Sequence, residues 1–141
     1  MSIYASISDV EPYIKFISDT PSTDLMRAVL DNSDSWINSR LLSNSLPIWK
    51  LENNKITPCE PVPGLLKTAA VYYAASDIIL SLYNGEEMPT QYDTYFNKAE
   101  SMLNAYIEQM TRELQATELK DQNIVKHSHA PTYFQRKGRR R

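Results

Sequence analysis

The feature that most constrains the fold is a heptad-like seam in the last third of the chain. Apolar residues recur there at alternating steps of four and three: Tyr92, Phe96, Ala99, Leu103, Tyr106 and Met110. This spacing places all of them on one side of an α-helix, and other helices must cover so long a seam. A cap that begins at Thr90 suits the start of that helix. The rest of the chain is therefore expected to supply helical partners.

Three other segments have helical patterns. Ser8 and Glu11 fit a capping box for a short first helix that ends near residue 17. Pro21 suits the start of a second helix, and residues 65–83 form the most apolar stretch, which Gly85 would end. The apolar stripe of the second helix comprises Leu25, Met26, Val29, Leu30, Trp36, Ile37, Leu41 and Leu42. We predict an all-α fold, a small four-helix bundle.

A long proline-rich connection separates the second helix from the third. Residues 43–64 contain four prolines and no helical period. Two short β-type runs flank Asn53 and Asn54, which tolerate the positive φ of a tight turn. A β-hairpin over residues 48–57 is one of two open interpretations, and an irregular loop is the other. A loop this long in a compact domain is more often functional than idle.

Charge divides the chain into an acidic body and a basic end. Residues 120–141 carry seven basic side chains and one acidic one, whereas residues 1–119 carry eight basic and sixteen acidic ones. The helical period fails past Lys120, and Pro131 prevents a helix from continuing through that point. We therefore predict a helical domain over residues 1–119 and an extended basic arm over residues 120–141.

The end of the arm combines aromatic and cationic residues. Its candidate contact residues are Tyr133, Phe134, Arg136, Lys137, Arg139, Arg140 and Arg141. One interpretation is docking onto an acidic protein surface, with the aromatic residues as anchors and the arginines as a charged rim. The second is binding to nucleic acid through phosphates and base stacking. The third is a solvated tail without a partner.

Scarce residue types argue against most catalytic and cofactor chemistry. Three isolated glycines cannot build a phosphate-binding loop or a dinucleotide fingerprint, and Cys59 is the single cysteine. His127 and His129 lack a third metal ligand nearby. Asp31 and Asp34 are interpreted as solvated surface. Asp77 interrupts an apolar helix, so we expect it either to bond to a buried partner such as a Tyr hydroxyl or Arg40, or to face a subunit boundary. We expect no enzyme, metal or cofactor, and no apolar run approaches the length of a membrane span.

Several strings resemble the head-tail adaptor, or head-completion, proteins of long-tailed bacteriophages. The matching segments are residues 8–16, 25–41 (LMRAVLDNSDSWINSRL), 62–70 (VPGLLKTAA), 72–77 (YYAASD) and 92–107. The resemblance covers about 100 residues and is one of pattern. It implies a small helical domain that forms a ring, commonly of twelve subunits, beneath the portal at the head vertex.

The resemblance also implies partners and a location. DNA would pass through the ring, a tail-completion or other neck protein would dock below it, and the arm, residues 120–141, would pack on the portal protein. Apart from the resemblance, the segment over residues 43–64 is too rich in proline to join the bundle, so we expect some of its large apolar residues to touch a neighbouring subunit or face the tail. These residues are Ile48, Trp49 and Leu51. The protein would be a structural component of the virion neck, assembled in the host cytoplasm. A tail-completion or terminator protein of the neck is the nearest alternative.

A small DNA-binding helical module that uses the basic tail is the alternative from another class. Such a module commonly carries several Arg or Lys residues on one helix face. None of the four predicted helices has such a face. The structural adaptor is therefore the preferred hypothesis.

Overall fold

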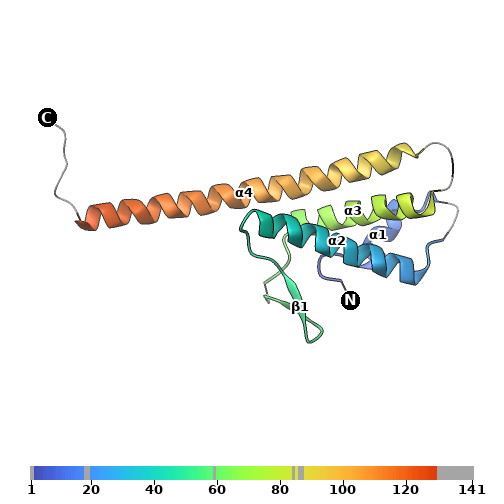
Figure 1. Cartoon of the computed structure of the whole chain (residues 1–141), viewed down its shortest axis with the longest axis horizontal. Helices are drawn as coiled ribbons and strands as arrows, with labels where there is room; N and C mark the ends of the chain where they lie inside the picture. Colours follow the sequence, from blue (N-terminus) through green and yellow to red (C-terminus); the bar gives the residue numbers. More distant parts are fainter. Residues whose placement is uncertain (1, 18–19, 59, 84, 86–87, 130–141) are drawn as a thin grey trace. The chain divides into compact units, whose positions relative to one another are not determined.

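The computed structural model describes residues 2–17, 20–58, 60–83, 85 and 88–129, the last ten of these by their backbone alone. These residues are mostly helical, with four α-helices and one two-stranded sheet, which confirms the predicted helical class. The elements shown in Figure 1 are α1 (Ile7–Val10), the 3₁₀ helix η1 (Glu11–Tyr13), α2 (Thr23–Ser43), β1 (Lys50–Glu52), β2 (Lys55–Thr57), α3 (Gly64–Leu82) and α4 (Thr90–His129). The chain divides into two compact units, Met1–Ile107 and Glu108–Arg141.

Helix α3 is the core helix of the first unit. Its alanines let neighbouring helices approach closely, and Ala69, Ala70, Ala74 and Ala75 are all fully buried. Its other buried residues are Leu66, Val71, Ser76, Ile78 and Ile79. We expected no apolar run to approach the length of a membrane span, but α3 is long and apolar enough by length and composition alone. Half of that stretch is buried within the protein, as in a core helix.

Helices α2 and α4 contribute one apolar stripe each. From the predicted seam of α4, Ala99, Leu103 and Tyr106 are buried, while Tyr92, Phe96 and Met110 are half-buried. The buried apolar residues of α2 are Met26, Val29, Leu30, Ile37 and Leu41. Leu42, predicted on the same stripe, is 59% exposed because it lies about 100° around the helix from Leu41.

Both N-terminal helices start elsewhere than predicted. The capping box of α1 pairs Ser6 with Asp9, whose carboxylate accepts from the Ser6 amide at 3.0 Å, so the helix begins two residues before the predicted start. It gives way to η1 at Glu11 and Pro12, which explains its shortness. Ser22 caps α2 and accepts from the Leu25 amide at 3.1 Å. Pro21 therefore precedes the cap.

The extended arm was predicted to begin at Lys120, and this prediction is wrong for its first ten residues. Helix α4 continues to His129, one residue before Ala130 and Pro131. Residues 120–129 contain no Gly or Pro, so nothing in them stops the helix even though the apolar period has ended. The compact unit that contains the core ends at Ile107, within α4, where the sequence suggested residue 119.

Removal of a buried leucine from the seam tests the packing of α4. Leu103 is fully buried, so we expect Leu103→Ala to lower the free energy of unfolding by about 2–5 kcal/mol through lost burial and the resulting cavity. Leu42→Ala is the matched control, and its cost should stay below about 0.5 kcal/mol, as for other exposed positions. Urea unfolding measures both, and equal costs would contradict the packing of α4 described here.

Candidate functional site: an anchored hairpin

The proline-rich connection contains a β-hairpin. Strands β1 and β2 pair antiparallel, with Leu51 opposite Ile56 and Glu52 opposite Lys55. Asn53 and Asn54 at the turn have φ of 51° and 60°, the left-handed conformation that a two-residue hairpin turn requires. Of the two open interpretations the hairpin is therefore right, although β1 begins at Lys50 instead of Ile48.

The base of the hairpin is fixed to the compact unit through Trp49. This residue is 6% exposed, and its ring meets that of Tyr4 edge-on at 6.3 Å between centroids. The Trp49 amide donates to the Tyr4 hydroxyl at 3.3 Å, and the Trp49 carbonyl accepts from Asn38 Nδ2 at 3.1 Å. The indole Nε1 donates to the carbonyl of Glu60 at 3.3 Å. Every polar group of Trp49 therefore has a partner within the protein.

This burial corrects the expectation that Trp49 touches a neighbouring subunit or faces the tail. Its side chain is held inside the protomer because the tight turn returns the chain, so that Glu60 meets the indole. Ile48 is half-buried and Leu51 is 38% exposed, so these two stay available for the predicted contact. The proline content suggested a loop outside the core, but a Trp at the foot of a hairpin can still pack inward.

A buried carboxylate holds the N-terminal segment beside the hairpin base. Asp34 of α2 is 8% exposed and accepts from the amides of Ile3 and Tyr4 at 2.9 and 3.2 Å. The Tyr4 hydroxyl donates to Asn38 Oδ1 one helical turn further along α2. Burial raises the pKa of the Asp34 carboxyl, although the two amide hydrogen bonds oppose the shift. Burial also raises the pKa of Tyr4 to about 12.

The interpretation of Asp34 as solvated surface is therefore wrong. The apolar spacing of α2 contained the signal, because Leu30, Asp34, Ile37 and Leu41 follow one another by four, three and four on a single helix face. A polar residue on a buried stripe needs a partner. That partner is the backbone of a segment 30 residues away, which no side-chain pattern indicates.

The strands beyond the hairpin base are accessible. Residues 50–55 are all exposed, and Ile56 is half-buried. Leu51 and Ile56 face each other across the strands, so they share one apolar side of the hairpin. Each strand has only one neighbour, which leaves one edge of each without backbone partners in the sheet. An anchored base and an accessible apolar side are suited to contact with another protein.

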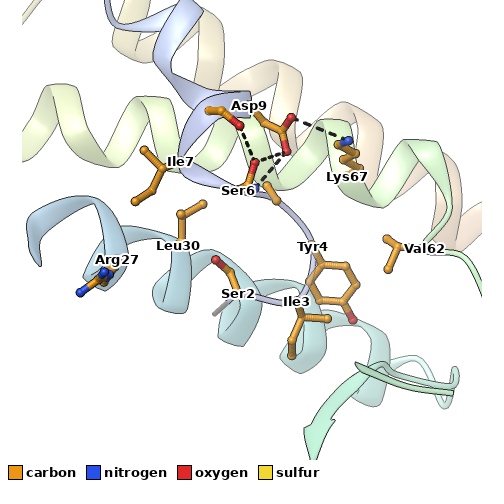
Figure 2. Close-up of a pocket in the computed structure, with 12 residues that line it drawn as sticks. Ser2, Ile3, Tyr4, Ser6, Ile7, Asp9, Arg27, Leu30, Val62 and Lys67 are labelled. Carbon is orange, nitrogen blue, oxygen red and sulfur yellow. Dashed lines mark hydrogen bonds and ion pairs between the residues drawn. The ribbon is translucent and has the colours of Figure 1, made fainter. Parts of the chain in front are cut away.

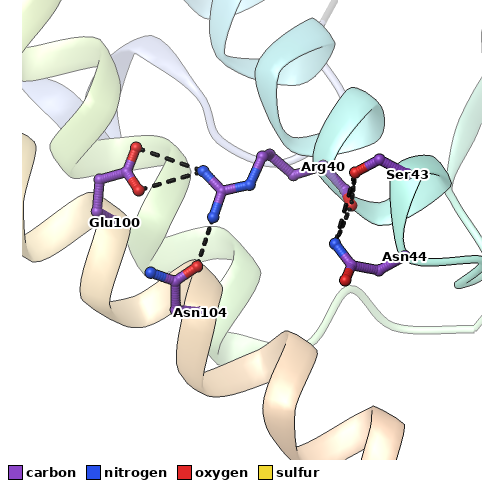
Figure 3. Close-up of polar contacts among 5 residues, drawn as sticks. All are labelled: Arg40, Ser43, Asn44, Glu100 and Asn104. Atoms are coloured by element: carbon purple, nitrogen blue, oxygen red, sulfur yellow. Dashed lines mark hydrogen bonds and ion pairs between the residues drawn. The ribbon is translucent and has the colours of Figure 1, made fainter.

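Asp77 has a partner other than those expected for it. Its carboxylate accepts from Asn32 Nδ2 at 3.4 Å, and among the described residues no hydrogen bond or ion pair joins it to Arg40 or to a tyrosine hydroxyl. Arg40 instead donates to Glu100 at 3.2 Å and to the Asn104 side chain, as Figure 3 shows. Arg40 therefore joins α2 to α4.

A hollow of about 770 Å³ lies along the N-terminal segment. Ile3, Ile7, Leu30 and Val62 line it together with polar residues. Figure 2 shows that the Asp9 carboxylate in this hollow lies between Ser6 and Lys67. The distance from Asp9 Oδ1 to Lys67 Nζ is 3.8 Å. These groups neutralise one another, so the hollow offers no free acid and base pair. Among the described residues no group of three His, Cys, Asp or Glu could hold a metal ion.

The predicted contact residues of the arm, Tyr133, Phe134, Arg136, Lys137, Arg139, Arg140 and Arg141, lie outside the described residues. His127 and His129 lie within the last ten residues of α4, 120–129, which the structure describes by their backbone alone. The predicted role of the arm therefore stays a prediction that rests on its composition.

Replacement of Asp34 tests the contact that holds the N-terminal segment. Asp34→Ala deprives two amides of their acceptor and should lower the free energy of unfolding by about 1–3 kcal/mol at pH 7. Because the pKa of the carboxyl is raised in the folded state, the wild type gains stability from this group as the pH falls through that pKa. The deficit of the variant should therefore grow between pH 7 and pH 4. Asp31→Ala, at an exposed position of α2, is the control, and a deficit that shrinks in acid would contradict the buried carboxylate.

Comparisons of the chain with protein-family models, with curated proteins and with solved structures found no match.

Proposed function

We propose that the chain is a structural adaptor of the neck of a long-tailed bacteriophage, with its four helices packed as a small bundle. A ring of copies would lie beneath the portal protein and join the head to the tail, with DNA passing through the channel. The observation that carries the proposal is the hairpin, whose base is buried in the protomer while its apolar side is accessible. In the sequence, segments that resemble head-tail adaptor proteins precede and follow this hairpin, at residues 25–41 and 62–70.

A structural joint needs surfaces that keep their shape before the partner arrives, because ordering a loose segment reduces affinity. Trp49 provides that preorganisation, since its amide, carbonyl and indole are all bonded within the protein. Leu51 and Ile48 would then be the residues that reach a neighbouring subunit or the tail. This arrangement also fits a tail-completion protein, which would present its hairpin to the other side of the same joint.

The basic end supports the partner assignment. Residues 120–141 carry seven basic side chains and one acidic one, and their first ten residues extend α4 to His129. Docking on an acidic surface of the portal would use Tyr133 and Phe134 as anchors. The DNA-binding alternative would use the arginines on phosphates.

Substitution of Leu51 tests the role of the hairpin. Leu51 is 38% exposed, so Leu51→Ser should leave the midpoint of thermal unfolding nearly unchanged. It should reduce the yield of complete particles when the chain is produced together with the portal, capsid and tail proteins of the proposed phage. Leu42→Ser, at another exposed leucine on α2, is the matched control and should assemble normally. Normal assembly with Leu51→Ser would contradict the role of the hairpin.

Substitutions in the arm separate the portal hypothesis from the DNA hypothesis. Docking predicts that Tyr133→Ala with Phe134→Ala weakens binding to purified portal protein by about 2–4 kcal/mol, as loss of buried aromatic anchors does. Replacement of Arg139, Arg140 and Arg141 by Gln should chiefly alter the salt dependence of binding to the portal protein. DNA binding predicts that the arginines dominate and that affinity for random duplex falls steeply with salt. Pull-down measures binding to portal protein and filter binding measures binding to duplex DNA, each at two salt concentrations. A chain truncated before residue 130 that still binds portal protein and DNA as the wild type does would contradict a role of the arm.

A further inference from the structure

Three tyrosines from three elements meet at one surface of the compact unit. Tyr13 of η1, Tyr72 of α3 and Tyr95 of α4 have ring centroids 5.2 to 5.9 Å apart, and all three are half-buried. The exposed Lys98 places its Nζ 5.3 Å from the centre of the Tyr72 ring. This tyrosine cluster therefore presents aromatic rings together with a cation.

A second aromatic surface lies next to it and involves α2 in place of η1. Trp36 stacks on Tyr73 with 4.4 Å between centroids, and Phe96 lies 6.4 Å from Tyr73 and 6.2 Å from Tyr92. These four rings, the tryptophan cluster, are half-buried as well. Asp77 follows Tyr73 by four residues in α3 and therefore lies on the same helix face, so this surface carries a nearby anion. Burial and then the negative charge of Asp77 raise the pKa of Tyr73, in agreement with this placement. Glu100 is also near, but Arg40 neutralises it at 3.2 Å.

The two clusters face different directions. Tyr72 and Tyr73 are consecutive in α3, and Tyr95 and Phe96 are consecutive in α4. Consecutive residues of an α-helix point about 100° apart. Each copy of the chain therefore has two unlike aromatic surfaces, one with Lys98 and the other with Asp77.

We propose that the tyrosine cluster of one copy packs on the tryptophan cluster of the next copy, with Lys98 facing Asp77. The proposal rests on the ring assembly of the proposed function and names the surfaces that would form it. Half-exposed Tyr and Trp rings are favoured in protein interfaces because they combine apolar area with polar tips. Contact between two copies of the same cluster would bring like charges together, whereas contact between unlike clusters brings opposite charges together. Unlike surfaces give head-to-tail contacts, which can close into a ring.

A charge exchange tests this pairing in the full-length chain. Lys98→Glu and Asp77→Lys should each weaken self-association by roughly tenfold, because each creates a like-charge contact. A mixture of the two variants should recover self-association, because Lys98→Glu still has Asp77 and Asp77→Lys still has Lys98. The double variant should recover it in a single chain. Sedimentation equilibrium at high protein concentration and low salt measures the association, and Arg27→Glu, at an exposed position of α2 outside both clusters, is the control.

Several outcomes would overturn the pairing. One is a wild-type chain that stays monomeric under these conditions. The others are a mixture that associates no better than either variant, and an Arg27→Glu variant whose association is weakened as much as that of Lys98→Glu. If circular dichroism shows that Asp77→Lys is unfolded, Asp77→Asn replaces it. This neutral variant should weaken association about threefold, and mixing it with Lys98→Glu should restore association in part, because its Lys98 can still meet the Asp77 of the other variant. Binding of the wild type to portal protein is measured separately, so a monomeric chain that still binds portal would contradict this pairing alone.

Discussion

The hydrogen bonds from the backbone of Ile3 and Tyr4 to the Asp34 carboxylate are the contact on which the candidate site depends. Buried amides need acceptors, and the two oxygens of Asp34 satisfy both at once. With its backbone held there, Tyr4 places its ring against Trp49 and its hydroxyl between Asn38 and the Trp49 amide. Asp34 therefore supports the hairpin base through Tyr4, in addition to the direct bonds of Trp49 to Asn38 and Glu60.

Helix α2 is attached to its neighbours by different means at different positions. Asp34 acts through buried hydrogen bonds, whereas Arg40 acts through a pair with Glu100 in which each side chain is 32% exposed. A surface pair of this kind adds at most about 1 kcal/mol, so it aligns α2 with α4 more than it stabilises them. The carbonyl of Arg40 also accepts from the side chains of Ser43 and Asn44 at the end of α2 (Figure 3).

Much of the helical framework could be predicted from the sequence because periodic apolar residues report the buried face directly. The stripe of α2, the apolar α3 and the seam of α4 were found in this way, and the paired asparagines indicated the hairpin turn. The partners of Asp34 and Trp49 could not be predicted, since backbone groups far along the chain supply them and any residue type has such groups. The end of α4 was missed for another reason: a helix can continue without an apolar period when nothing stops it.

The unbroken course of α4 has a mechanical consequence. A pull on residues beyond Ile107 acts on the hydrogen bonds of this helix along its axis. The same helix contains Leu103 and Ala99, which are fully buried. Tension applied to the second unit is thus carried to the interior of the first without passing through a loop. Extraction of two buried side chains from a packed interior resists far more force than the straightening of a flexible linker does.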